Sequence, residues 1–298
     1  MKIPALIFFL FLSTIVLGQE KITSELNLNY SLIHYNDTVG RVRQFDFRIT
    51  APIYKNGNSR LSGNLSYNSE SLNNFPSAYG TSMQGIGIGL NWTNIINQHS
   101  VLIISGQAGI YSDMNNLSSN AFRERLGFTW LTKHSDKLSL GFGLSYARQF
   151  YGNQLIPIVA VIYHFDNEHW KLSGAFPESP KLTYNLNDKS AVSLQLKAQF
   201  ASYRLTSAED SGTFVKNSKL TSLLSYEYAF AKSWRISAGI GYAMRQRYEL
   251  YKDNYDSNGW YFIGRPLGNR PTPITSIVQN GPQFHIGLAL TRRFKSSE

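Results

Sequence analysis

Residues 85–92, Gly-Ile-Gly-Ile-Gly-Leu-Asn-Trp, alternate strictly between a small or polar side chain and a large apolar one. Because side chains on a β-strand point to opposite faces with a period of two, this stretch predicts a strand with one apolar face. The glycines resemble a phosphate-binding loop only superficially, since they lie within an alternating strand and no helix follows. We interpret them as sites of close packing or strand bending.

The same alternation recurs along the chain from Ile22 onward. Most of the alternating stretches are on the order of ten residues or longer, the length that a tilted strand needs to cross a bilayer. The pattern predicts fourteen strands at 22–34, 41–53, 60–70, 82–94, 99–111, 121–133, 137–150, 155–166, 169–176, 181–187, 190–203, 218–230, 232–249 and 281–294.

The lengths of the links between these strands distinguish a soluble sandwich from a transmembrane barrel. A soluble sandwich also alternates, but here mostly short and longer links follow one another, as in an up-and-down transmembrane barrel with both termini on one side. Segment 155–189 is the weakest part, because residues 156–165 are apolar at both parities and the 169–187 hairpin is short and proline-rich. Twelve strands therefore stay possible beside fourteen. Aromatic residues near strand ends suit interfacial girdles; they are Tyr30, Tyr67, Trp92, Trp130, Tyr146, Trp170, Trp234 and Tyr242.

The N-terminus has the form of a secretory signal peptide. Lys2 supplies a positive charge, and the run from Ala5 to Leu17 is apolar except for Ser13 and Thr14. This run is short for a membrane anchor, so we expect cleavage rather than retention. The predicted organisation is a signal peptide at 1–18 and one outer-membrane barrel domain at 19–298, with both mature termini in the periplasm.

Composition supports export and argues against several classes of function. The chain has no cysteine, which excludes disulfide frameworks, zinc–thiolate sites and thiol nucleophiles. Its net charge of +10 comes from scattered basic residues among alternating aromatics, which does not fit a nucleic-acid binder. The expected partners are outer-membrane lipid, the outer-membrane barrel assembly machinery and an unknown small-molecule solute, with no nucleic acid and no cofactor.

No constellation of residues indicates catalysis or metal binding. Acidic residues in two late links could activate water only with a histidine, and none is near them in sequence. His164 and His169 bracket a turn with two acidic residues, which is more typical of a polar hairpin than of a metal site. We therefore predict a protein that is not an enzyme.

Two regions are candidates for function. The first is a set of charged side chains predicted to face the lumen, where they either select permeant ions or form salt bridges that close it: Asp46, Arg48, Arg125, Lys197, Glu227, Arg235, Arg245 and His285. The second is the long link at 250–280, predicted to fold over or into the barrel mouth and set access. Its candidate residues are Trp260, Tyr261, Arg265 and Arg270.

These features favour passive, porin-like transport or import of a small ligand. An adhesion or partner-binding barrel that uses its outer links is the alternative from another class. An outer-membrane hydrolase comes third, because the six histidines are scattered and no Ser–His or Asp–His arrangement is evident.

The central part of the chain resembles an uncharacterised family of Gram-negative outer-membrane β-barrels that carries only a domain-of-unknown-function label. The resemblance lies in residues 141–157, Gly-Phe-Gly-Leu-Ser-Tyr-Ala-Arg-Gln-Phe-Tyr-Gly-Asn-Gln-Leu-Ile-Pro, and in residues 170–184, Trp-Lys-Leu-Ser-Gly-Ala-Phe-Pro-Glu-Ser-Pro-Lys-Leu-Thr-Tyr. It implies the barrel and the compartment, and no activity. Many such barrels end on an aromatic residue that the assembly machinery recognises, whereas here Phe294 is followed by four more residues.

Overall fold

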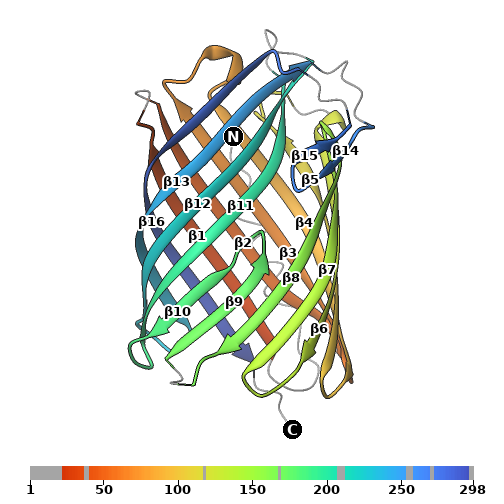
Figure 1. The fold of residues 1–298 in the computed structure, drawn as a ribbon, viewed down its shortest axis with the longest axis vertical. Helices are drawn as coiled ribbons and strands as arrows, with labels where there is room; N and C mark the ends of the chain where they lie inside the picture. The colour runs from red at the N-terminus through yellow and green to blue at the C-terminus, as the bar shows by residue number, and fades with distance from the viewer. Residues whose placement is uncertain are drawn as a thin grey trace, which may run out of the picture.

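The computed structural model describes residues 22–36, 40–116, 119–166, 169–206, 212–252, 258–268 and 272–294. The predicted signal peptide lies outside these residues. Within them, a single ring of strands forms the wall of a barrel (Figure 1). The wall strands are β1 (Ile22–His34), β2 (Arg41–Asn56), β3 (Ser59–Asn73), β4 (Ser82–Asn97), β5 (Ser100–Ser112), β6 (Phe122–Lys133), β7 (Leu138–Gln149), β8 (Gly152–His164), β9 (Trp170–Phe176), β10 (Lys181–Asn185), β11 (Ser190–Leu205), β12 (Thr213–Ala229), β13 (Trp234–Lys252) and β16 (Thr275–Phe294).

The ring closes because every wall strand pairs with two other wall strands. Each wall strand pairs antiparallel with its neighbour in sequence, β13 pairs with β16, and β1 pairs with β16. Fourteen strands thus form a closed antiparallel barrel, which confirms the predicted fold class and the higher of the two predicted strand numbers. Short turns lie at the end where β1 starts and β16 stops, which we call the short-turn end. The opposite end is the long-link end.

The outward face of the wall is apolar and exposed. Ile88 is 66% exposed, Phe142 67% and Ile240 61%, whereas the inward neighbours of Ile88 are glycines. In water such a belt would be strongly unfavourable, so this is the surface of a barrel that lies in lipid. None of the helices in the described part of the chain is long and apolar enough to cross a membrane.

Two short hairpins interrupt the regular wall. Strands β9 and β10 have only seven and five residues and end part of the way up the wall (Figure 1). Within the long link, β14 (Trp260–Phe262) and β15 (Arg265–Leu267) form a second hairpin, and β14 runs parallel to β8. Two 3-10 turns, η1 (Ser77–Tyr79) and η2 (Ser119–Ala121), lie in links at the long-link end.

The far ends of three strands bend into the lumen. We call this block of residues 201–205, 213–217 and 248–252 the flap; all of it is buried except Arg204, Thr213 and Lys252. Just before the flap, Met244 is an extra residue between the pairs Ala243–Thr221 and Arg245–Leu220. Because a β-bulge bends a strand and increases its twist, this bulge accounts for the inward turn.

Candidate functional site

The lumen near the short-turn end is lined by charged and polar side chains, which we call the chamber. His285 on β16 is within electrostatic range of Asp46 on β2 and of Lys197 on β11. These strands are not direct neighbours, since β1 lies between β2 and β16 and two strands lie between β16 and β11, so charged side chains from separate strands share this part of the lumen. The chamber comprises Ser31, Asp46, Arg48, Arg125, Glu178, Lys181, Lys197, Glu227, Arg235 and His285.

Ion pairs and hydrogen bonds join several of these residues in separate groups. Glu227 pairs with Lys181, and its second carboxylate oxygen lies 3.5 Å from Arg235. Ser31 Oγ and His285 Nδ1 are 3.1 Å apart. The pairs are incompletely buried, since the Arg235 side chain is 61% exposed although its strand partners place it on the inner face. Solvent therefore reaches the chamber.

Arg125 connects β6 to the link between β9 and β10. Its guanidinium donates to the carboxylate of Glu178, and its Nε donates to Ser145 Oγ at 2.7 Å. The side chains of Arg125 and Glu178 are 41% and 25% exposed. This pair fixes the turn of the short hairpin from inside the barrel.

Arg245 is a correction to the predicted lumen set. It pairs with Leu220, which lies on the exposed outer face between the buried residues Lys219 and Thr221. Residues that oppose each other in an antiparallel pair share a face, so Arg245 points outward. The extra residue Met244 shifts the parity of β13, and strict alternation from Arg235 assigns the wrong side.

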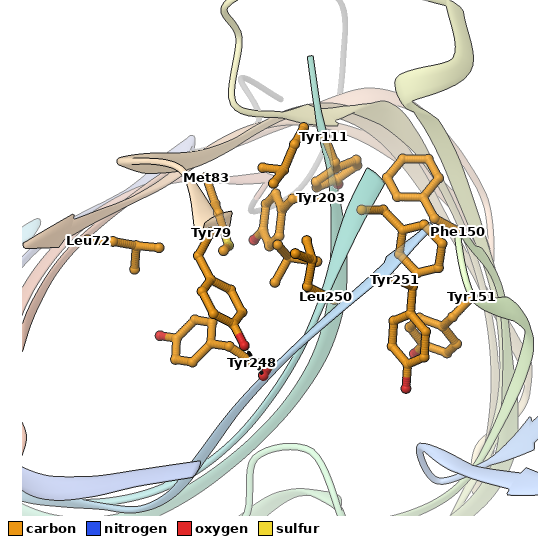
Figure 2. Close-up of a cluster of buried hydrophobic side chains, with 14 of the residues drawn as sticks. Leu72, Tyr79, Met83, Tyr111, Phe150, Tyr151, Tyr203, Tyr248, Leu250 and Tyr251 are labelled. Atoms are coloured by element: carbon orange, nitrogen blue, oxygen red, sulfur yellow. Dashed lines mark hydrogen bonds between the residues drawn. The ribbon is translucent and has the colours of Figure 1, made fainter. Parts of the chain in front are cut away.

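The lumen at the long-link end holds a cluster of buried aromatic and aliphatic side chains gathered inside the ring of strands (Figure 2). One face of the flap packs against the β1–β5 side. Tyr203 donates a hydrogen bond to Asn68 at 3.0 Å, and the hydroxyls of Tyr35 and Tyr248 are 3.3 Å apart. Tyr79 of η1 donates to the carbonyl of Tyr248 at 3.3 Å.

The other face of the flap packs against the β7–β8 turn and β14. Ser202 Oγ donates to Gln149 at 2.9 Å and accepts from the backbone N–H of Phe150 at 3.0 Å. The ammonium of Lys216 lies 5.1 Å from the ring centres of both Tyr151 and Tyr261. Because both of its faces are covered, the flap spans the lumen from one wall to the other.

Two ion pairs are buried beside or within the flap. Lys219 on β12 pairs with Glu70 on β3, and each side chain is 5% exposed. Lys216 and Glu249 are 3.2 Å apart and are 6% and 1% exposed. Asn217 also donates to Glu70 at 3.1 Å, so this carboxylate joins β3 to the flap.

The predicted mouth-loop residues lie beside the wall rather than across the lumen. Tyr261 is buried against Tyr151, with ring centres 4.7 Å apart, whereas Trp260 and Arg265 are exposed. Arg270 lies outside the described residues. The lumen is instead occupied by the flap, of which only residues 250–252 belong to the link that was predicted to cover the mouth.

The described residues hold no group of three or more histidine, cysteine, aspartate or glutamate side chains that could bind a metal. His164 and His169 are both exposed at the short-turn end. No catalytic residue was predicted. The lumen instead contains a solvent-exposed charged chamber near the short-turn end and a buried aromatic cluster around the flap at the long-link end.

Comparisons with known proteins identify one matching family and several similar solved structures. A family model described as "Domain of unknown function (DUF6268)" matches residues 36–258. Among solved structures, the COG4313 outer membrane channel from Pseudomonas putida F1 has 12% sequence identity and a TM-score of 0.45, over 94% of this chain and 97% of that chain. The NanC porin has 9% identity and a TM-score of 0.39, over 90% and 98% of the two chains. The Pseudomonas putida toluene transporter TodX has 10% identity and a TM-score of 0.36, over 95% and 91%. No curated protein matches the sequence.

Proposed function

This chain belongs to the DUF6268 family, as its resemblance predicted, and we propose that it is a gated outer-membrane barrel that passes small solutes, anions in preference to cations. The proposal rests on two parts of the lumen. The chamber provides a wet charged path, and the flap with its aromatic cluster closes the long-link end.

The basic chamber is the observation that carries the proposal. Its five cations are Arg48, Arg125, Lys181, Lys197 and Arg235, and its three anions are Asp46, Glu178 and Glu227, an excess of two positive charges. Exposed charges that line a narrow lumen attract counter-ions and select between permeant ions by their sign.

The composition of the closure supports a gate rather than a permanent seal. Apolar residues in place of a buried ion pair are often neutral or stabilising, so a seal that never opened would gain little from Glu70 and Lys219. Asn217 Oδ1 and both amide atoms of Gln246 are also buried without a hydrogen-bond partner among the described residues. Each such group costs about 1–3 kcal/mol, and water relieves that cost when the flap moves.

The orientation of the barrel belongs to the same proposal. Outer-membrane barrels have short turns and both termini on the periplasmic side and longer links outside. We assign the short-turn end to the periplasm, after removal of residues 1–18 and insertion by the barrel assembly machinery. The flap then closes the outer mouth, and the chamber opens toward the periplasm.

Conductance in a planar lipid bilayer tests the gate. Glu70→Gln leaves the buried Lys219 without a charged partner, which destabilises the closed state by about 3–5 kcal/mol. We expect the folded Glu70→Gln barrel to open more often and to carry more current than the unchanged protein. The double variant Glu70→Leu/Lys219→Met replaces the pair with apolar side chains and should restore the low current.

An exposed ion pair provides the matched control. Asp136→Asn removes the pair between Asp136 and Lys133 in the β6–β7 turn, where the aspartate side chain is 96% exposed. Solvent screens such an exposed pair, which contributes little to stability, so the current should not change. A Glu70→Gln barrel that is folded, as judged by heat-dependent migration in a gel, and that carries no current at any voltage would falsify the proposed function.

A further inference from the structure

The wall of the barrel is incomplete at one place. Strand pairing between β8 and β9 ends at Val159 and Phe176, and pairing between β10 and β11 ends at Lys181 and Gln195. Beyond these pairs β8 continues along the wall, whereas β11 turns inward to join the flap. The two strands therefore separate above the short β9–β10 hairpin (Figure 1).

Two hairpins bridge the separated strands from above and below. Above, the β14–β15 turn reaches from β8 to β12, the strand beside β11: Ile263 N–H donates to the carbonyl of Leu155 at 3.0 Å, and Lys216 of β12 donates to the carbonyl of Gly264 at 3.4 Å. Below, Ala198 N–H donates to the carbonyl of Glu178 at 2.8 Å. Between the bridges, residues 156–158 of β8 have no strand partner on this side within the described chain.

We call this interruption the seam: residues 156–158 on β8 and residues 199–200 on β11. From Leu155 to Val159 it extends about 13 Å along β8, at roughly 3.3 Å per residue. Among the described wall strands outside the seam and the short β9–β10 hairpin, long runs of paired residues join each strand to its neighbours. The seam is consequently the part of the wall that separates with the fewest broken hydrogen bonds.

The two sides of the seam differ in chemistry. Its outer rim carries exposed apolar side chains, with Val159 at 42%, Phe176 at 40% and Phe262 at 44% exposed. On its inner side stand the Arg125–Glu178 pair and the exposed ammonium of Lys197. A molecule that crosses here meets lipid-like surface first and cationic side chains next.

We propose that the seam is a lateral route between the membrane and the chamber for amphiphiles with an apolar chain and one carboxylate head. The carboxylate head replaces Glu178 as the ion-pair partner of Arg125 and contacts Lys197. The apolar chain of the amphiphile lies along Val159 and Phe176. The Arg125–Glu178 pair is the latch, because Glu178 belongs to the link that forms the lower edge of the seam. This inference deepens the proposed function, since it names a substrate class for the same chamber.

Photolabelling of the full-length barrel in lipid vesicles tests the route. The probe is a fatty acid with a diazirine in its chain, and mass spectrometry locates the labelled residues. Label should concentrate on the rim residues Val159 and Phe176, which are 42% and 40% exposed, relative to Ile88, which lies away from the seam on β4 and is more exposed at 66%. Lys197→Gln should reduce seam labelling about tenfold, as expected for the loss of one charge-assisted hydrogen bond.

Two further measurements test whether labelling at the seam depends on the charge of the probe and on opening of the seam. A matched alkyl ammonium probe should give no excess at the seam, because the chamber repels it. Since the natural chain lacks cysteine, Arg125→Cys/Glu178→Cys can be bridged by a bifunctional thiol reagent. Bridging should lock the seam and abolish the excess labelling that Lys197 still supports in the unbridged double variant. Equal labelling of seam and Ile88, or equal labelling by the two probes, overturns the route.

The route and the gate can fail separately. Conductance of the bridged barrel in the Glu70→Gln background measures the mouth alone, and it should persist when the seam is locked. Normal current with uniform labelling rejects the seam and leaves the proposed function intact. Seam labelling with no current in Glu70→Gln rejects the outer gate and supports lateral entry.

Discussion

Gly281 of β16 lies against the backbone of His34 on β1 and pairs with Ala243 on β13, at the base of the flap. A Cβ atom on Gly281 would lie 1.8 Å from the carbonyl oxygen of His34, and its partner across the β13 ladder is the small, fully buried Ala243. Two small residues at this level let the strands close while the flap turns inward. The requirement is for space, because the obstacle is backbone that cannot rotate away.

Substitution of this glycine gives the first prediction. Gly281→Ala should lower the midpoint of thermal unfolding in detergent, at a cost of about 1–3 kcal/mol for an overpacked site. Gly106→Ala is the control, because a Cβ there would lie 3.5 Å from a flexible Leu126 methyl group. Circular dichroism of both purified barrels makes the comparison, and equal midpoints would contradict the steric argument.

At the scale of strands, the alternation of side chains predicted the wall strands correctly but did not predict where their pairing is irregular. All fourteen predicted wall strands are present, and even the weak segment around 155–189 forms β8, β9 and β10. Arg245 was misplaced because the Met244 bulge shifts parity, and a bulge leaves no mark in a pattern of alternate residues. On β12 the outward-facing positions do become polar at Lys216, which is a signal for the flap that the alternation pattern alone did not use.

The β14–β15 hairpin shows another limit of sequence patterns. Its two-residue turn places Ile263 at a φ of 48° and Gly264 at a φ of 76°. Turns of this kind favour Asn-Gly, and a β-branched residue with positive φ is rarely chosen. The turn therefore had no recognisable signature, and contacts with Phe200 and Lys216 explain why it forms here.

The bulge gives a prediction at the scale of the strand. Deletion of Met244 makes the pairing of β13 with both neighbours regular, so the flap should lose its inward bend. We expect higher conductance and new trypsin cleavage after Lys216, which is 5% exposed in the closed barrel. Deletion of Ile53, the extra residue of the β2–β3 bulge at the short-turn end, should change neither measurement. A Met244 deletion that folds with Lys216 still protected would contradict this origin of the bend.

For the whole molecule, the distribution of charge matters more than the net charge of +10. Many basic residues lie on turns and links, where salt screens them and they affect the lumen little. The chamber charges act on any ion within the narrow lumen, because the distances there are comparable with the Debye length of about 10 Å at 0.1 M salt. Selectivity should therefore follow the chamber residues and weaken as salt rises.

The reversal potential across a salt gradient measures this selectivity in the open Glu70→Gln background. We expect anion preference, strongest in dilute salt and small near 1 M, where the Debye length falls to about 3 Å. Lys197→Glu/Arg235→Glu changes the chamber from five cations and three anions to three cations and five anions, so the preference should invert to cations. Lys232→Glu makes a similar change on the exposed β12–β13 turn and should leave anion preference in place. Inversion by Lys232→Glu, or none by the chamber pair, would show that the permeant path does not run past Lys197 and Arg235.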